Sequence, residues 1–421
     1  MCYYINKVQI GFEETQSQGG FMKVAGIITE YNPFHNGHKY QLSEVRRITS
    51  ADYIVIAMSG NFVQRGTPAI MDKYARTQMA LNQGADLVLE LPSLWATASA
   101  EYFAKGGVSL LNSTGVVNQL CFGAECTELS VLQEYCRLIL KEDDLFKEKL
   151  NRFLKKGLSY PIARMKAHGI SISHDFSSPN NILAIEYLKA LQGLDIEPVL
   201  IPRLGDGYND SSVNSILASA TAIRNLLHNN DADQVQELTP CYDAIKDYYD
   251  SHGFVCENYV SEMLYYKLLS EKEKGYTQYA DCNASLSAKI VNMLPKYCSF
   301  EQFCNLLKSK DITHSRIRRV LCHILLGITS KDMTSFSADN KIPYIRVLGF
   351  RKDASSLLNS IKKEATAPII TKVADASSHL DSKSQLILDK DIFASNLYNA
   401  LINRNNKKSV KNDFCHEIII L

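Results

Sequence analysis

The chain has 421 residues, enough for two or three domains, and its 46 Lys and Arg balance 45 Asp and Glu to a formal net charge of +1. This balance excludes nucleic-acid binding through bulk positive charge, so any basic surface must come from local clustering. No apolar run has membrane-spanning length, and the eleven scattered cysteines form no C-x-x-C pair. This is typical of a cytoplasmic protein rather than of a disulfide framework or a zinc site.

The first 21 residues lack the basic segment and apolar core of a secretory signal. Met22 begins the first clear strand pattern. We therefore expect the native protein to start at Met22, and residues 1–21 to be a poorly ordered extension.

Five short apolar runs then have the pattern of strands buried on both faces of a parallel sheet. They are residues 22–29, 52–60, 85–92, 116–125 and 195–203. Helical patterns lie between them at 37–49, 72–84 and 99–115, the last of which we expect Gly106 and Gly107 to interrupt. The alternation predicts an α/β fold with a Rossmann-like parallel sheet over residues 22–235, with ligands bound at the carboxyl ends of the strands.

The second half has a different pattern. Residues 284–297, 299–310 and 315–328 have helical periodicity, and only 343–350 and 367–373 resemble strands. We predict that residues 236–421 form a mainly helical C-terminal domain.

Two histidines, His35 and His38, flank the turn between the first strand and the first helix. A helix that starts near Gly37 offers unpaired N–H groups and a partial positive charge, which suit a phosphate. A glycine there allows a ligand to approach the backbone. Both imidazoles can then stabilise charge that builds during substitution at phosphorus. The alternative is an ordinary turn histidine followed by a surface histidine.

A second phosphate signal is the segment SATAIR at residues 219–224. Ser219 or Thr221 can cap a helix whose N–H groups face the same phosphates, and Arg224 adds a fixed charge on the β/γ side. The alternative is an ordinary capped helix with a surface arginine.

Six motifs follow one another in a fixed order. They are EYNPFHNGH (30–38), AMSGNFVQRGTPAIMDKYARTQMAL (57–81), GADLVLELP (84–92), CFGAE (121–125), SPNNILAIEYL (178–188) and SATAIR (219–224). Together they closely resemble the bacterial tRNA(Met) cytidine acetate ligase family, which belongs to the nucleotidyltransferases with a His-x-Gly-His site. The resemblance runs from Met22 to about residue 230 and continues more weakly to residue 373.

The resemblance implies a two-step reaction. Acetate attacks the α-phosphate of ATP to give acetyl-adenylate and pyrophosphate, and the N4 amine of the wobble cytidine of elongator tRNA(Met) then takes the acetyl group. It also implies catalytic roles for His35 and His38, and an ATP site of two parts. The first part is the loop formed by Ile28, Thr29, Glu30, Tyr31, Asn32, Pro33, Phe34, His35, Asn36, Gly37, His38, Lys39, Tyr40 and Gln41. The second part is Gly123, Asn180, Arg203 and Leu204.

The residue types of the second part suit a nucleotide. Gly123 ends the fourth strand, where adenosine or ribose must pass close to the backbone. The Asn180 amide can bind ribose or base edges, or it is a plain helix cap. Arg203 ends the fifth strand and can bind a phosphate bidentately, or it forms a surface ion pair.

Basic residues outside this site are candidates for tRNA contacts. Arg65, Lys73 and Arg76 follow a turn at residues 59–61, and we read them as tRNA or pyrophosphate contacts or as a solvated helix face. Arg316, Arg318 and Arg319 form a basic stretch of a later helix, which either tracks tRNA phosphates or faces solvent. Arg346, Arg351 and Lys352 add to this set.

No residue cluster resembles a dedicated metal site, so we expect Mg²⁺ to arrive with ATP. No membrane or protein partner is implied. Two competing functions use the same pocket: a small-molecule adenylyltransferase, and a non-enzymatic nucleotide or RNA sensor. An adenylyltransferase would leave about half of the chain without a role. A sensor would not need two histidines and an arginine that converge on the phosphates.

Overall fold

A computed structural model describes residues 22–140, 144–156, 178–203, 218–229, 232–310, 312–337, 341–405 and 407–421, with Ala163, Lys166, Ala167, Gly169 and Phe176. The predicted extension before Met22 and the predicted site residue Leu204 lie outside the described residues.

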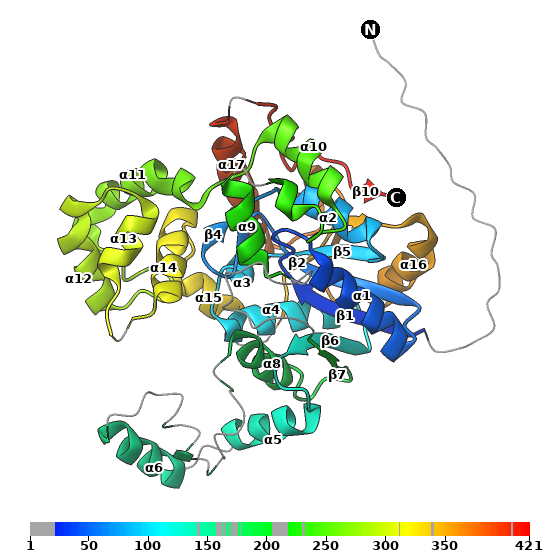
Figure 1. Ribbon diagram of the computed structural model, residues 1–421, viewed down its shortest axis with the longest axis horizontal. Helices are drawn as coiled ribbons and strands as arrows, with labels where there is room; N and C mark the ends of the chain where they lie inside the picture. The colour runs from blue at the N-terminus through cyan, green and yellow to red at the C-terminus, as the bar shows by residue number, and fades with distance from the viewer. Residues whose placement is uncertain are drawn as a thin grey trace.

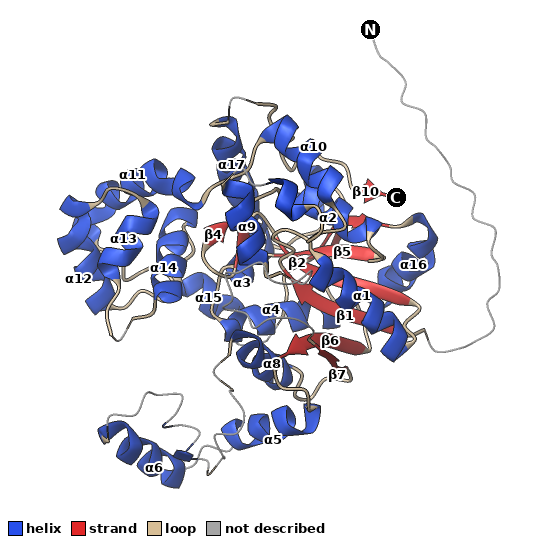
Figure 2. Cartoon of the chain, in the orientation of Figure 1, coloured by secondary structure: helices blue, strands red, loops and turns tan. Residues whose placement is uncertain are grey.

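A mostly parallel sheet forms the centre of the molecule (Figures 1 and 2). Five parallel strands, in the order β5-β2-β1-β6-β7, make up most of it. They are β1 (Val24–Thr29), β2 (Tyr53–Ser59), β5 (Leu87–Leu91), β6 (Gln119–Ala124) and β7 (Glu197–Pro202). Each lies within one of the five predicted runs, so the Rossmann-like sheet is confirmed.

Apolar side chains on both faces explain why these runs are strands. Along β1, Val24 packs into one core cluster while Ala25 and Ile27 pack into another. Helices α1 (Asn36–Thr49) and α2 (Lys73–Asn82) contribute to the second cluster, and α4 (Ala100–Asn112) and α8 (Pro179–Ala190) to the first. The sheet is therefore buried between two helical layers, as its continuous apolar runs predict.

Helix α4 runs through Gly106 and Gly107 without the predicted interruption. A Cβ at Gly106 would lie 2.3 Å from Cγ of Trp95, and one at Gly107 would lie 2.6 Å from Cδ1 of Ile28. The two glycines therefore allow close packing of the helix, and this packing gain offsets their poor helix propensity.

Four helices form a group beside the sheet: α11 (Ser261–Glu271), α12 (Ala284–Met293), α13 (Phe300–Leu307) and α14 (His314–Leu326) (Figure 1). Helices α12 and α13 fall within helices predicted for the second half, and α14 begins one residue before the predicted range of 315–328. None of the helices within the described ranges is long and apolar enough to cross a membrane.

Chain beyond the predicted division at residue 235 also contributes to the first sheet. Strands β8 (Ile345–Phe350), β9 (Ile369–Ile370) and β10 (Ile419–Ile420) join the first sheet, and β8 pairs antiparallel with β5. Five of the six residues of β8 are buried, so this strand covers an edge that β5 would otherwise expose.

The remaining elements connect these parts. The α-helices are α3 (Ser93–Ala96), α5 (Leu129–Leu140), α6 (Asp144–Lys155), α9 (Ala220–His228), α10 (Tyr242–His252), α15 (Ser330–Ser337), α16 (Ser355–Glu364) and α17 (Ser382–Asn403). Strands β3 (Phe62–Val63) and β4 (Thr67–Pro68) form a hairpin. Short 3₁₀ helices span Ala232–Val235, Glu257–Val260, Lys272–Lys274, Leu294–Lys296, Lys352–Ala354 and Val373–Ser378.

Candidate active site at the first strand–helix turn

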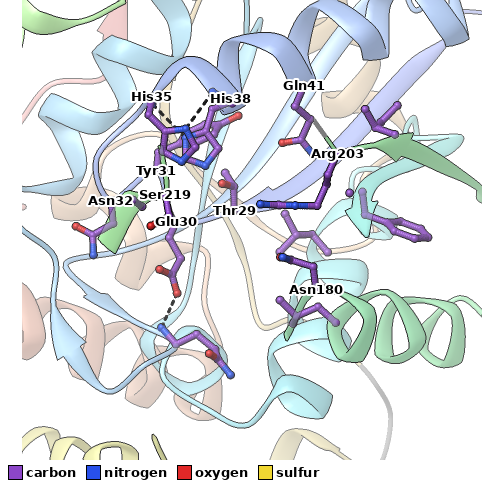
Figure 3. Close-up of a pocket in the computed structure, with 18 of the residues that line it drawn as sticks. Thr29, Glu30, Tyr31, Asn32, His35, His38, Gln41, Asn180, Arg203 and Ser219 are labelled. Carbon is purple, nitrogen blue, oxygen red and sulfur yellow. Dashed lines mark hydrogen bonds between the residues drawn. The ribbon is translucent and has the colours of Figure 1, made fainter. Parts of the chain in front are cut away.

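A cavity of about 260 Å³ opens at the carboxyl ends of β1, β6 and β7 (Figure 3). It lies where the strand order reverses between β1 and β6, which is where open α/β sheets bind ligands. The predicted residues that line it are Ile28, Thr29, Glu30, Tyr31, Asn32, His35, Gly37, His38, Tyr40, Gln41, Arg65, Gly123, Asn180, Arg203, Ser219, Thr221 and Arg224.

Four residues of the predicted loop do not line this cavity. Pro33 and Phe34 are buried, and Phe34 packs in the core beside α1. The Asn36 side chain donates a hydrogen bond to the carbonyl oxygen of Glu237 (2.6 Å), and Lys39 is exposed. These four positions shape the loop rather than the surface of the pocket.

The two histidines stack on one another at the start of α1, with ring centroids 3.7 Å apart and an interplanar angle of 25°. The backbone N–H of Gly37 donates to Nδ1 of His35 (3.1 Å), and the backbone N–H of His35 donates to Nδ1 of His38 (3.3 Å). Because each Nδ1 accepts a hydrogen bond, the proton of each neutral ring is on Nε2. The pair therefore has two Nε2–H donors to offer a ligand.

Both rings are held neutral by their surroundings. Burial, Arg203 and Arg224 lower the pKa of His35 to about 3, and burial, His35 and Arg203 lower the pKa of His38 well below its ordinary value. The rings can therefore hydrogen-bond an anion without carrying charge. Positive charge in the pocket comes from the arginines and from the N-terminus of α1.

Gly37 has a packing role beyond the one that the sequence predicts. A Cβ at this position would lie 2.9 Å from Cε1 of His35, so any other residue would displace the His35 ring. The glycine therefore preserves the stacked pair.

Helix α9 brings a second N-terminus to the pocket. Ser219 is its cap and accepts the backbone N–H of Ala222 (3.2 Å), so the cap is Ser219 and not Thr221. Thr221 instead accepts a hydrogen bond from Arg224 (3.1 Å), which also donates to the carbonyl oxygen of Asn32 (2.7 Å). Arg224 is thus fixed to the loop that carries the histidines, and it is not a mobile surface side chain.

Glu125, which the residue-by-residue prediction missed, organises the opposite wall. Its carboxylate accepts hydrogen bonds from Nδ2 of Asn180 (2.6 Å), the hydroxyl of Ser178 (2.9 Å) and the backbone N–H of Asn181 (3.0 Å). A carboxylate at the N-terminus of α8 is favoured by the helix dipole. Asn180 lies inside this helix and is oriented by Glu125, while Ser178 is the cap residue. The sequence feature that could have indicated a role for Glu125 is its position directly after a buried strand, at the end of the CFGAE motif.

Arg203 extends across the pocket between Gln41 and Asn180 (Figure 3). A Cβ at Gly123 would lie 3.1 Å from Cγ of Arg203, so this glycine makes room for the arginine. Burial lowers the pKa of Arg203, and Glu125 partly offsets this. Arg203 forms no ion pair within the described ranges, so its charge is directed into the pocket rather than to a surface partner.

Arg76 does not contact tRNA directly and does not lie on a solvated face, because its side chain is fully buried. It donates only to backbone carbonyl oxygens: to Glu30 (2.6 Å), Ser59 (3.0 Å) and Met71 (3.0 Å), and to Gly60. This residue therefore joins the ends of β1 and β2 beneath the pocket.

Lys73 is also fully buried, which contradicts its predicted contact with tRNA or pyrophosphate. Its Nζ lies 2.8 Å from Oε1 of Glu90 and 2.9 Å from Oδ2 of Asp413. Arg346 binds the same two carboxylates at 2.8 and 2.9 Å. Lys73, Arg346, Glu90 and Asp413 form what we call the buried charge cluster. Arg346 therefore does not belong to a basic surface.

The three arginines of α14 are paired with acids and are not a free basic face. Arg316 and Arg319 share Asp281 at 3.1 and 3.3 Å, and Arg318 binds Glu257 at 2.6 Å. The side chains of Arg318 and Arg319 are only 14% and 13% exposed, whereas that of Arg316 is 33% exposed. The net charge of this group is therefore close to one positive charge.

The chain matches the model of a family described as HIGH Nucleotidyl Transferase over residues 22–413. A tRNA(Met) cytidine acetate ligase of Clostridium perfringens is 40% identical over 397 residues, which cover 90% of this chain and 96% of that protein. A tRNA(Met) cytidine acetate ligase of Acetivibrio thermocellus is 36% identical, with 95% of this chain and all of that protein covered.

Solved structures show the same fold. The crystal structure of apo Thermotoga maritima TmcAL superposes with a TM-score of 0.88 at 31% identity, and covers 95% of this chain and all of that chain. A second structure of that protein, bound with alpha-thio ATP, gives 0.87 at 30% identity with the same coverage. The similarity seen in six short motifs thus extends over nearly the whole chain. The chain belongs to the tRNA(Met) cytidine acetate ligase family of HIGH nucleotidyl transferases.

Proposed function

We propose that this protein is a cytoplasmic ATP-dependent ligase that activates acetate as acetyl-adenylate and transfers the acetyl group to N4 of the wobble cytidine of elongator tRNA(Met). Its relatives are named for this tRNA and for acetate, and a similar structure contains an ATP analogue. The ten cysteines within the described ranges are all free, which suits a reducing compartment.

The stacked histidine pair is the observation that supports this proposal most strongly. Two neutral Nε2–H donors, the N-terminus of α1 and the guanidinium groups of Arg203 and Arg224 meet in one pocket. Fixed donors of this kind stabilise charge on the α-phosphate as acetate attacks it, because they need no reorganisation during the reaction. The capped N-terminus of α9, with Arg224, is placed to hold the departing pyrophosphate.

An assay with labelled acetate, ATP and purified tRNA tests this function. We expect label in the tRNA only when ATP is present, and N4-acetylcytidine after digestion to nucleosides. A small-molecule adenylyltransferase would instead leave the tRNA unlabelled and transfer the nucleotide to a second small substrate. Unlabelled tRNA(Met) would therefore contradict the proposal.

We infer that Mg²⁺ enters with ATP. Within the described ranges no group of three or more His, Cys, Asp or Glu side chains forms a metal site, and Glu30 is the one acidic side chain among the described residues that line the pocket. Bound Mg²⁺ would neutralise charge on the phosphates. Excess chelator should slow acetate-dependent pyrophosphate release by about 10²-fold or more, and added Mg²⁺ should restore it. Full activity in chelator would mean that the arginines suffice.

We infer that Arg316, the most exposed arginine of α14, contacts a tRNA phosphate. Each lost phosphate contact reduces the slope of log affinity against log salt by about one. Replacing Arg316 with Gln should therefore weaken tRNA binding and flatten this slope by about one, whereas the Lys362→Gln control on α16 should not. An unchanged slope in the Arg316 variant would show that the pair with Asp281 is purely structural. Arg65 lines the pocket and remains a candidate for contact with pyrophosphate or with tRNA.

A further inference from the structure

Glu30 is an anomaly in a pocket that otherwise suits phosphate. Among the described residues that line the cavity it is the one carboxylate, and it directly follows β1. A carboxylate in a pocket for a triphosphate repels the ligand and weakens its binding. Its presence in this pocket therefore calls for a functional explanation. Hydrogen bonds from neighbouring residues fix its position.

Both the backbone and the side chain of Glu30 are fixed. The buried guanidinium of Arg76 donates to the Glu30 carbonyl oxygen (2.6 Å), and the backbone N–H of Gln64 donates to the Glu30 side-chain Oε1 (3.0 Å; Figure 3). The other oxygen, Oε2, has no hydrogen-bond partner within the described ranges. Among the described residues, Arg76 on α2, Arg224 on α9 and Tyr187 on α8 interact electrostatically with it, and none of these three forms an ion pair with it.

The histidines, Tyr31, Tyr187 and the arginines among the described residues that line the pocket are poorly suited to accept a proton. Each histidine uses Nδ1 as an acceptor and carries its proton on Nε2. Burial raises the pKa of Tyr31 and of Tyr187, so both remain phenols. Arginines do not lose their protons in proteins. Glu30, the one carboxylate among the described residues that line the pocket, is therefore the side chain best suited to act as a base there.

The second half-reaction of the proposed function requires such a base. The exocyclic amine of cytosine donates hydrogen bonds, and carboxylates are its usual acceptors. When N4 attacks the carbonyl carbon of acetyl-adenylate, a bond from N4 to that carbon forms and the bond from that carbon to the phosphate oxygen of AMP breaks. AMP leaves with the electron pair, and one proton must leave N4.

We propose that Glu30 is the catalytic base of acetyl transfer: Oε2 accepts the N4–H of the cytidine, orients the amine and takes its proton as AMP leaves. This inference rests on the proposed function and assigns its second step to one side chain. The Gln64 N–H keeps Oε1 occupied, so that Oε2 is directed to the amine. The proton then passes to solvent after AMP and the acetylated tRNA depart.

The test measures the two half-reactions separately in Glu30→Gln, which keeps the shape of the side chain and an acceptor for the Gln64 N–H. Transfer from supplied acetyl-adenylate to tRNA should fall by about 10²–10³-fold, the loss expected for a general base. Acetate-dependent pyrophosphate release should fall by a much smaller factor than transfer does.

Two further variants complete the test. Glu30→Asp keeps a carboxylate and should recover part of the transfer rate, whereas Glu197→Gln, an exposed neutralisation at the start of β7, should behave as wild type. Equal transfer rates in wild type and Glu30→Gln would overturn the proposal. Loss of pyrophosphate release, reversed by excess Mg²⁺, would identify Glu30 as a metal ligand instead and would also overturn it. Failure of the wild type to acetylate tRNA would refute the proposed function itself.

Discussion

Replacing His38 with Ala should slow the formation of acetyl-adenylate by about 10²–10³-fold, the loss typical of removing one preorganised donor. The variant loses the Nε2–H that would stabilise charge on the α-phosphate. It also loses the Nδ1 atom that accepts the His35 N–H and the ring that stacks on His35. The position of the second donor therefore changes as well. Acetate-dependent release of pyrophosphate in the absence of tRNA measures this step directly.

Arg47→Ala is a matched control for the histidine variant, because Arg47 lies on the same helix, is exposed and pairs only with Glu44. Its rate should be close to that of the wild type. Because the pKa of His38 lies well below its ordinary value, the wild-type rate should also show no titration of this residue between about pH 6 and pH 8. Near-normal pyrophosphate release by His38→Ala would refute the assignment of the histidine pair.

Replacing Lys73 with Met should lower the free energy of unfolding by about 3–5 kcal/mol, because removal of one partner leaves buried charge without compensation. In the wild type, Lys73 and Arg346 share Glu90 and Asp413, and Ser395 accepts a further hydrogen bond from Lys73 (3.0 Å). In the variant the two carboxylates retain only Arg346 as a cation. The midpoint of urea unfolding measures the loss.

Lys105→Met is the matched control for the buried charge cluster. Lys105 pairs with Glu101 on the surface of α4, and such exposed pairs contribute about 0–1 kcal/mol. If Lys73 instead contacted tRNA, its replacement would flatten the salt dependence of tRNA binding and leave the unfolding midpoint unchanged. That result would contradict the buried role.

Local sequence was sufficient for the parallel strands and for the histidine turn. Each strand is a continuous apolar run, because both of its faces are covered, and this pattern is visible without knowledge of its neighbours. The turn between β1 and α1 is likewise determined within a few residues. His35 and His38 cap the helix that they begin, so their proximity follows from chain spacing alone.

Partners distant in sequence decide the features that were predicted incorrectly. Lys73 and Arg76 have the spacing of a solvated basic face, but their partners are a carboxylate 340 residues away and a set of backbone carbonyls. Arg318 is similarly paired with Glu257. The role of β8 was hidden for the same reason, because an antiparallel strand added to a parallel sheet leaves no strand–helix alternation in the sequence.

The separation of Lys73 from Asp413 also has a consequence during protein synthesis. A ribosome adds about 5–20 residues per second, so Lys73 leaves the exit tunnel on the order of tens of seconds before Asp413 is made. During that interval Glu90 is the one carboxylate of the buried charge cluster available to Lys73 and, later, to Arg346. The first half alone, with Lys73 and Glu90, carries one charge of each sign, and Arg346 adds an excess positive charge until Asp413 is made. These buried contacts, which join α2 and β8 to the C-terminal segment, therefore form only when translation is nearly complete.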